Sequence, residues 1–426
     1  MQIANDFRRA ARLVQRVLRG RRNLAELRRL LDARAPLPKQ HYRVGVYFAD
    51  GPINLYQMRQ WYAPLRELSK THPVLVLARG ASGALSLMQE SGLDVVYTRR
   101  IGEIEELLAE QRLGAMLYVN QNARNFQMMR YGTLWHVFVS HGESDKIYMA
   151  SNQNKAYDYS FIAGDAARDR LTRALWDYDV DRRTFAIGRP QNDHLQGAPP
   201  FAPDDRTVVF YAPTWEGDRA SMSYGSVASH GEALVRRLIA TGRHRVVYRP
   251  HPRSGVMDRD YGAANERIIQ MIAEANRKDP SAHHVYDQSP SIDWQLSLPE
   301  VAICDVSAMV YDRLATGKPL MVTRPVSPEA EIDEIGYLGV CEWLGADQAR
   351  RADEALDRVI GDTAAQQRLS AWSQHYFGDT TPGAPTKRFH EAVETLLERA
   401  EEWRARQAEA EHEGAAERET GSGSGR

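Results

Sequence analysis

The sequence predicts an α/β protein made of two halves, each a parallel sheet covered by helices. Short apolar runs alternate with helix-length segments, a proline-rich break divides the chain, and the same alternation restarts after the break. At 426 residues the chain is long enough for two cores, because a single core rarely grows beyond roughly 250 to 300 residues. We therefore expect a cleft between two halves.

The first half contains six apolar runs of strand length. Patterned stretches such as EIEELLAEQ separate some of them and are typical of helices. Continuous apolar runs joined by helices predict parallel strands that are buried on both faces of their sheet. The expected strands are 43–49, 73–79, 93–99, 114–120, 135–141 and 159–164.

A proline-rich segment, GAPPFAPDD at 197–205, has the composition of a linker, and strand-like runs resume after it. Two helical segments, 365–377 and 386–403, close the sequence and could run back along the first half. The strands expected in the second half are 206–214, 244–252, 283–287, 300–307 and 318–325.

These boundaries predict four parts of the chain. They are a basic amphipathic helical segment (1–40), a first Rossmann-like domain (41–198), a second Rossmann-like domain (199–380), and a C-terminal crossing helix with a disordered tail (381–426).

Bulk composition excludes several classes of protein. The net charge is −1, which does not indicate a nucleic-acid partner. Cys304 and Cys341 are the only cysteines, too few for a disulfide framework or a four-cysteine zinc site. The sequence has no apolar run near the ~20 residues that span a bilayer and no apolar signal-peptide core. We expect a cytoplasmic protein.

The first 34 residues are strongly basic, with ten arginines against three acidic residues. Phe7, Ala11, Val14 and Leu18 lie at helical spacing and form an apolar stripe. Such a helix either lies on an anionic membrane surface or packs its stripe on the protein itself. The sequence leaves both readings open.

Polar motifs follow the expected strands, where a parallel sheet builds its binding site. His141, in HGESDK, ends a strand of the first half, and His251, in YRPHP, ends one of the second. In DVSAMVYD, Asp305 or Ser307 can cap a helix whose free N–H groups suit an anion. Helix capping alone would explain Asp305 or Ser307. A purely structural role explains less well why two histidines, one from each half, should face the same predicted cleft.

Five motifs occur in order: HGESDK, GRPQND, YAPTW, RPHP, and DVSAMVYD followed by KP. In this combination the sequence resembles the CDP-glycerol glycerophosphotransferase family, the teichoic-acid and capsule polymerases and primases. The resemblance implies two Rossmann-like domains in a GT-B arrangement with an interdomain cleft, closed by a C-terminal helix that crosses back. It implies that the acceptor binds to the first domain (41–198) and the CDP-donor to the second (199–380).

The sequence departs from the family pattern at several places beside these motifs. Ser140 stands where the family usually has tryptophan, and Glu143 and Ser144 replace a usual Thr-Pro. The usual arginine after the proline of the second motif is Gln191, while Arg189 precedes that proline. Identity of the donor is therefore less firmly implied than the class of reaction.

The resemblance implies transfer of glycerol phosphate, or another polyol phosphate, from a CDP-activated donor to an acceptor hydroxyl, with release of CMP. Imidazole has the pKa of a good general base, so we expect His141 to be the base, oriented by Asp193, and His251 to stabilise the diphosphate. The expected substrate-binding residues are Gly142, Lys146, Thr214, Arg249, Asp305, Ser307, Ala308 and Asp312.

The expected partners are a CDP-polyol and a lipid-linked or glycan acceptor, with the inner membrane surface as a further partner of residues 1–34. We expect no bound metal or other cofactor, although Mg²⁺ could accompany the donor. Glycerol and ribitol donors, and primase and polymerase activities, remain open. The rival readings are a GT-B glycosyltransferase that uses a nucleotide sugar and a scaffold that binds the donor without turnover.

Overall fold

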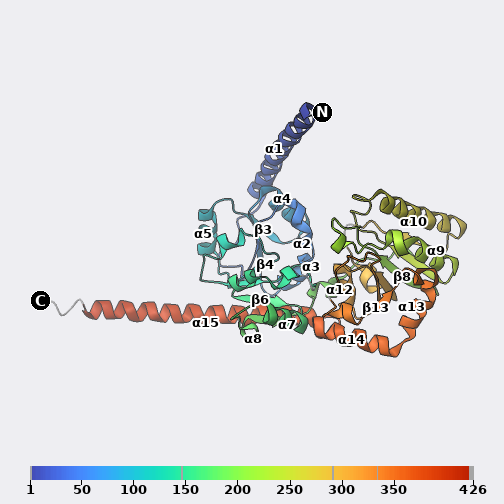
Figure 1. The fold of residues 1–426 in the computed structure, drawn as a ribbon. Helices are drawn as coiled ribbons and strands as arrows, with labels where there is room; N and C mark the ends of the chain where they lie inside the picture. Colours follow the sequence, from blue (N-terminus) through green and yellow to red (C-terminus); the bar gives the residue numbers. More distant parts are fainter. Residues whose placement is uncertain (1, 145–146, 290–291, 333, 422–426) are drawn as a thin grey trace.

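The computed structural model describes residues 2–144, 147–289, 292–332 and 334–421. Within them the chain forms two sheets, one in each half (Figure 1). The first sheet has seven strands in the order β3-β2-β1-β4-β5-β6-β7, and the second has six in the order β10-β9-β8-β11-β12-β13. In both sheets, the neighbouring strands that the structure describes are parallel. The two-sheet α/β architecture is as predicted.

All six strands expected in the first half are present, and the structure adds a short edge strand, β7. The strands of the first sheet are Val44–Phe48 (β1), Val74–Ala78 (β2), Asp94–Tyr97 (β3), Ala115–Tyr118 (β4), Trp135–Phe138 (β5), Tyr159–Ile162 (β6) and Thr184–Ala186 (β7).

The second sheet likewise contains its five expected strands and an added edge strand, β13. Its strands are Thr207–Ala212 (β8), His244–Tyr248 (β9), Val285–Tyr286 (β10), Val301–Cys304 (β11), Leu320–Thr323 (β12) and Glu342–Leu344 (β13).

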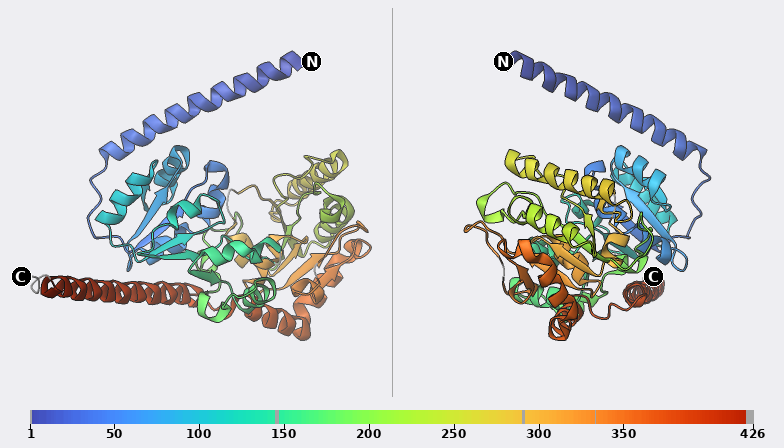
Figure 2. Two further views of the ribbon diagram at one scale, coloured as in Figure 1. Left: turned by 60° about the vertical axis from the view of Figure 1, so that its left-hand side comes forward. Right: turned by 90° about the vertical axis from the view of Figure 1, so that its right-hand side faces the viewer.

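Helices connect the strands and cover the sheets (Figure 2). Before β8 they are Gln2–Ala33 (α1), Leu55–Arg59 (α2), Tyr62–Leu68 (α3), Ala81–Glu90 (α4), Ile101–Glu110 (α5), Asn125–Met128 (α6), Asp165–Ala174 (α7) and Val180–Arg183 (α8). After β8 they are Glu232–Ala240 (α9), Arg259–Lys278 (α10), Trp294–Ser297 (α11), Ala308–Leu314 (α12), Ala352–Gly361 (α13), Thr363–Phe377 (α14) and Ala384–Gly421 (α15).

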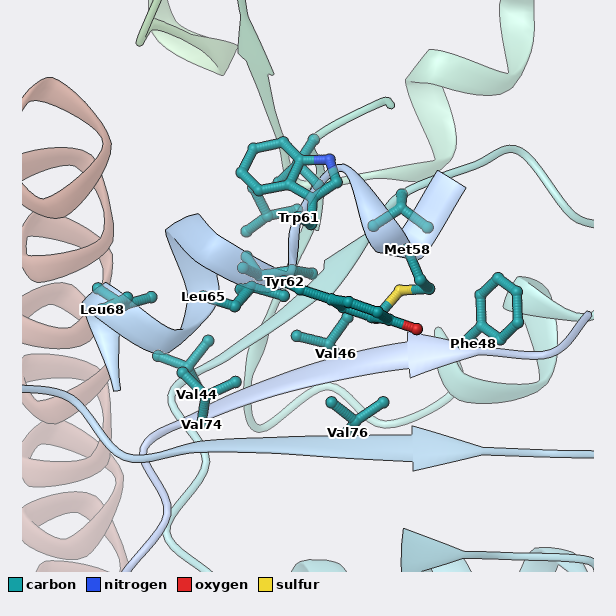
Figure 3. Close-up of a cluster of buried hydrophobic side chains, with 14 of the residues drawn as sticks. Val44, Val46, Phe48, Met58, Trp61, Tyr62, Leu65, Leu68, Val74 and Val76 are labelled. Carbon is teal, nitrogen blue, oxygen red and sulfur yellow. The ribbon is translucent and has the colours of Figure 1, made fainter. Parts of the chain in front are cut away.

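The core of the first half lies between β1, β2 and the helices α2 and α3. Val46 and Val76 on the strands face Met58 and Leu65 on the helices, and all four side chains are buried (Figure 3). Burial of each such aliphatic side chain contributes roughly 1.5 to 3 kcal/mol. This packing holds the loops that leave the ends of β1 and β2 in fixed positions.

The C-terminal helix α15 crosses back to the first half, as predicted. Phe389, Val393 and Leu396 are fully buried and belong to the same core as β1 and β2. The helix then continues beyond the lobe as a long projection (Figures 1 and 2). Its apolar first part therefore ties the end of the chain to the first domain.

Helix α1 packs on the first lobe only near its C-terminal end, and its contact with a membrane stays a prediction. Near its C-terminal end Leu27 is fully buried, and Asn23 Nδ2 donates to Ser82 Oγ at 3.0 Å. The rest of the helix projects away from the lobe (Figures 1 and 2). No described helix is long and apolar enough to cross a membrane.

The strand orders place a crevice at the carboxyl edge of each sheet. Strand order reverses between β1 and β4 in the first sheet and between β8 and β11 in the second. Connections leave such neighbouring strands toward opposite faces, which opens a space for a ligand. Asp50 and Asn120 follow β1 and β4, whereas Thr214 and Asp305 follow β8 and β11.

Candidate functional site

A cavity lies at the carboxyl edge of the first sheet, and we call it the N-half cavity. Its volume is about 290 Å³. The loops after β1, β4 and β5 supply its walls. Its polar lining includes Asp50, Gln57, Asn120, Asn122, Ser140 and His141.

His141 has a defined tautomer in this cavity. Its Nδ1 lies 3.0 Å from the carbonyl oxygen of Val119. A carbonyl oxygen can only accept, so Nδ1 carries the proton and Nε2 of the neutral ring is left as a proton acceptor. Burial lowers the pKa of His141, and the positive charge of Arg189 lowers it further against the opposing effects of the Val119 carbonyl and Asp312. His141 is therefore neutral and able to act as a base at pH 7.

The turn that presents His141 is held in a strained conformation. Ser140 has φ of 56°, in the left-handed region that residues other than glycine rarely occupy. Its carbonyl oxygen accepts a hydrogen bond of 2.6 Å from the Trp61 indole, and its Oγ donates to the Gly142 carbonyl. Strain of this kind costs about 1 to 3 kcal/mol and occurs at sites whose geometry is tightly constrained.

A second cavity lies at the carboxyl edge of the second sheet, and we call it the C-half cavity. Its volume is about 390 Å³. The loops after β8, β9 and β11 supply its walls. Its lining includes Thr214, Trp215, Arg249, His251, Ser307 and Ala308, five of which are expected site residues.

His251 has the opposite tautomer to His141. The backbone N–H of Arg253 donates to His251 Nδ1 at 3.1 Å. Nδ1 must therefore be unprotonated, and the neutral ring carries its proton on Nε2. Burial lowers the pKa of His251, the positive charge of Arg253 lowers it further, and Glu216 opposes both effects. His251 thus presents an N–H donor, and the Trp215 ring stacks on it at a centroid distance of 6.4 Å.

Asp305 is an internal support of the C-half cavity and is not exposed to a ligand. The side chain is fully buried. Its carboxylate accepts from the backbone N–H groups of Thr214 and Ser226 and from the Thr323 hydroxyl, at 2.8, 2.9 and 2.5 Å. Burial nevertheless raises the pKa of Asp305 to about 6. The expectation that Asp305 contacts the substrate is wrong in this structure, because three protein donors surround it.

Ser307 caps α12, as the sequence predicted. Its Oγ accepts from the Met309 N–H at 3.3 Å. Ser307 and Ala308 both line the C-half cavity, as does Thr214, whose N–H is taken by Asp305. The N-terminus of α12 therefore lies at the C-half cavity, and the anion that the sequence predicts for this helix end stays a prediction.

Arg249 is positioned differently from the expectation. Its Nη1 donates to the buried Asp287 carboxylate at 2.5 Å, and its Nη2 donates to the Ser289 carbonyl at 2.8 Å. Asp287 also neutralises its charge. Arg249 lines the cavity, and each terminal nitrogen keeps a second N–H group beside these contacts, so its predicted contact with a phosphate stays a prediction.

Asp193 does not act on His141 as expected. Its carboxylate accepts from the backbone N–H groups of Gly383 and Thr386 and from the Thr386 hydroxyl, at 2.9, 2.8 and 2.6 Å. These donors lie at the start of α15. Asp193 therefore anchors the crossing helix, and the Val119 carbonyl takes the orienting role that we assigned to Asp193.

The two halves are joined by an ion pair between Arg189 and Asp312. Arg189 Nη2 lies 2.6 Å from Asp312 Oδ1, and the side chains are only 10% and 18% exposed. Asp312 was expected to face a ribose or solvent, and the structure shows it engaged by Arg189 instead. Both charges act on His141, while the first residues of the Asp312 helix line the C-half cavity. The pair thus links the surroundings of both histidines.

For two further residues expected to bind the substrate, Gly142 and Lys146, the structure gives less information. A Cβ added at Gly142 would meet only Arg189 Nη1, at 3.8 Å, so packing within the protein does not require glycine there. Lys146 lies outside the described residues. Among the residues that the structure describes, no three His, Cys, Asp or Glu side chains gather as a metal-binding group.

The family model described as CDP-Glycerol:Poly(glycerophosphate) glycerophosphotransferase matches residues 136–327, which include both histidines and the Arg189–Asp312 pair. A search of curated proteins found no match.

Solved structures resemble the whole chain. The wall teichoic acid polymerase TagF is 14% identical, with a TM-score of 0.53, and the alignment covers 93% of this chain and 98% of that one. A histidine variant of TagF soaked with CDPG gives the same TM-score and coverage at 13% identity. A putative UDP-N-acetylglucosamine 2-epimerase from Listeria monocytogenes is 15% identical, with a TM-score of 0.52, over 84% of this chain and 97% of that one. At these identities the structures show a shared fold.

The fold is that of a two-domain α/β protein of the GT-B type. The match over residues 136–327 confirms, for that part of the chain, the resemblance to the CDP-glycerol glycerophosphotransferase family seen in the sequence. The chain is accordingly a glycerophosphotransferase-like enzyme.

Proposed function

We propose that this enzyme transfers a polyol phosphate, most simply glycerol phosphate, from a CDP-activated donor to an acceptor hydroxyl and releases CMP. One observation carries the proposal: two neutral histidines with complementary tautomers line cavities in the two halves, within the region that matches the family. We assign the reaction to synthesis of a teichoic-acid-like or capsular polymer.

His141 is the general base in this proposal. Its Nε2 takes the proton of the acceptor hydroxyl as the oxygen forms a bond to the phosphorus that carries the polyol. The bond from that phosphorus to the bridging oxygen breaks, and both electrons leave with CMP. Base catalysis of this kind contributes about 10² to 10⁴ in rate. The lowered pKa keeps His141 unprotonated at pH 7.

His251 is the proposed electrostatic partner on the donor side. Its Nε2–H donates to the diphosphate as negative charge moves onto CMP, and the backbone at Ser307 and Ala308 lies on the same cavity. Arg253, whose guanidinium carbon lies 3.7 Å from the Trp215 ring centroid, brings a positive charge to this wall. Arg249 acts through Asp287 to fix the loop that carries His251.

Gly142 and Thr214 complete the proposed substrate contacts. Because packing does not require glycine at 142, close approach of a substrate is our reason for a residue without a side chain. Thr214 lines the C-half cavity, and Asp305 holds the Thr214 backbone N–H in place. We infer no resident metal or other cofactor, with Mg²⁺ entering only as a companion of the donor diphosphate.

Product analysis tests the proposal against a nucleotide-sugar glycosyltransferase. The purified chain is incubated with CDP-glycerol, CDP-ribitol and UDP-sugars, each with and without a glycan or lipid-linked acceptor. We expect acceptor-dependent CMP from a CDP-polyol. Release of UDP alone would favour sugar transfer and would remove the roles assigned to His141 and His251, while donor binding without any release would favour a scaffold.

We further propose that the projecting part of α1 rests on the anionic inner face of a membrane, next to a lipid-linked acceptor. Attraction to such a surface amounts to about 1 kcal/mol per basic residue. Deletion of residues 2–18 leaves Asn23 and the buried Leu27 in place. It should weaken binding to anionic liposomes without lowering activity on a soluble acceptor, and equal liposome binding by both proteins would refute this location.

A further inference from the structure

The N-half cavity carries a side-chain arrangement that the reaction at His141 does not use. Asp50 Oδ2 and Oδ1 accept hydrogen bonds of 2.7 Å from Asn120 Nδ2 and Asn122 Nδ2, respectively. Asn120 Nδ2 donates a second bond of 2.7 Å to Gln57 Oε1. These four residues come from the loop after β4, the end of β1 and helix α2, so the fold brings them together from distant parts of the chain.

The hydrogen bonds fix how this polar wall is presented. Both N–H groups of Asn120 are used, and Gln57 Nε2 donates to the Tyr56 hydroxyl at 3.3 Å, so neither amide is free to turn over. Each Asp50 oxygen keeps a second acceptor position, and Asn122 keeps a second N–H. The wall therefore presents fixed donors and acceptors side by side, the pattern that a hydroxyl group satisfies because it both donates and accepts.

The Asp50 carboxylate disfavours a phosphorylated ligand at this wall. The cavity lining contains the Asp50 carboxylate and the neutral His141, and no lysine or arginine belongs to the described lining. A phosphate monoester carries about −1.5 to −2 charges at pH 7, and Asp50 would repel it. An uncharged polyol or sugar has no such penalty.

An aromatic ring lies where such a ligand would meet the base. Tyr56 is 49% exposed and makes an edge contact with the His141 ring at a centroid distance of 5.8 Å. An exposed ring offers an apolar face to the carbon side of a sugar or polyol, while its hydroxyl remains tied to Gln57. The position of the cavity, at the reversal of strand order between β1 and β4, is the usual ligand position in such a sheet.

We propose that Asp50, Asn120, Asn122, Gln57 and Tyr56 form a binding site for the uncharged, hydroxyl-rich end of the acceptor, and that this site turns one hydroxyl toward His141 Nε2. The inference rests on the proposed function for its link to catalysis, but binding itself does not depend on turnover. A vicinal diol is the recognised chemistry, and either a terminal glycerol unit or a sugar ring can supply it.

Direct binding tests the site, with glycerophosphoglycerol as the diol-ended probe, methyl glucoside as the sugar probe and glycerol 2-phosphate, which has no vicinal diol, as the phosphate-ended comparison. Dissociation constants are measured on the full chain by ligand-observed NMR. We expect one of the two diol probes to bind at least tenfold more tightly than glycerol 2-phosphate, and the better one identifies the source of the diol. A smaller difference, tighter binding of glycerol 2-phosphate, or no binding of either diol probe would overturn the proposal.

Variants then locate the binding. N122D sets a second carboxylate against Asp50 without changing side-chain size and should weaken the diol probe at least tenfold. Y56A removes an exposed ring and should weaken it about threefold or more, which keeps the test valid if N122D fails to fold. Q127A removes an exposed amide of α6 outside the cavity lining and should bind as the unsubstituted protein does.

Steady-state kinetics separate this site from the proposed reaction. With a diol-ended acceptor, N122D and Y56A should raise the acceptor KM more than they lower kcat and leave the donor KM within about twofold. Unchanged probe binding in both variants would overturn the site. If the protein releases no CMP but the variants still weaken probe binding, the site is supported and the proposed function is refuted.

Discussion

The buried ion pair between Arg189 and Asp312 gives a quantitative test of how the two halves are joined. Opposite charges 4 Å apart attract by about 4 kcal/mol at an effective dielectric constant of about 20, and here the nitrogen and oxygen are only 2.6 Å apart. Arg189 Nε has no hydrogen-bond partner among the described residues, so the guanidinium depends heavily on Asp312. Removing Asp312 would leave a nearly buried cation without its charge partner.

We expect D312L to lower the free energy of unfolding by about 3 to 5 kcal/mol, the usual cost of leaving one buried charge alone. R189M should cost a similar amount for the same reason. The double variant removes both charges and replaces them with apolar side chains of comparable size, so it should cost less than either single change. The coupling energy between the two positions should therefore be about 3 kcal/mol or more.

Urea unfolding of the four proteins, followed by tryptophan fluorescence and by circular dichroism, measures this coupling. Because a chain with two domains need not unfold in one step, the two signals must give coincident transitions before energies are compared. Additive single effects, with coupling below about 0.5 kcal/mol, would show that Arg189 and Asp312 do not hold the halves together as described.

The same variants should shift the pKa of His141 in opposite directions. Arg189 lowers this pKa and Asp312 raises it. The acid limb of the kcat/KM profile should therefore move to higher pH in R189M and to lower pH in D312L. Shifts of the same sign in both variants would refute the electrostatic account of His141.

Three further predictions concern single residues. Because the neutral form of His141 is the active one and its folded pKa is lowered, kcat/KM should level off at high pH and fall tenfold per pH unit below a midpoint under 6.5; a midpoint above 6.5 in the measured profile would contradict this. H251A should lower kcat by about 10² to 10³ in CMP-release assays, and a loss below tenfold would remove His251 from the charge-stabilising role. D305A leaves the buried N–H groups of Thr214 and Ser226 without their acceptor and should destabilise the chain by roughly 3 to 5 kcal/mol in urea, whereas a cost below about 1 kcal/mol would mean that other groups support these loops.

Much of the fold could be predicted because its signals are local. Each long central strand is a continuous apolar run, and the runs end at polar residues that the structure places at the carboxyl edges. The edge strands β7 (TFA) and β13 (EWL) were not predicted because neither is a continuous apolar run, and shortness alone is not the reason, since β10 has only two residues and was predicted. Helix α15 was predicted to cross back, and Phe389 and Val393 confirm it.

The site was predicted only in part. The strand ends identify His141 and His251, but the tautomer of each depends on a backbone partner, Val119 or Arg253, whose position the sequence does not reveal. Arg249 looked like a free cation because Asp287 lies 38 positions away along the chain.

Pairings between distant residues also explain the other differences. Asp193 was assigned to His141 because both belong to motifs, yet its partners at Gly383 and Thr386 are about 190 positions away. The sequence shows Arg189 as a departure from the family pattern but assigns no role to it. The same strand-end rule that found His141 could have found Asp50 and Asn120, which also follow strands.

Transfer of labelled glycerol phosphate from CDP-glycerol to a diol-ended acceptor, compared between the unsubstituted protein and H141A at pH 7, tests the central claim most directly. The account predicts acceptor-dependent product with an equal amount of CMP, and a rate lower by about 10² to 10⁴ in H141A at unchanged donor affinity. Transfer by H141A within tenfold of the unsubstituted protein would contradict the assignment of His141 as the base.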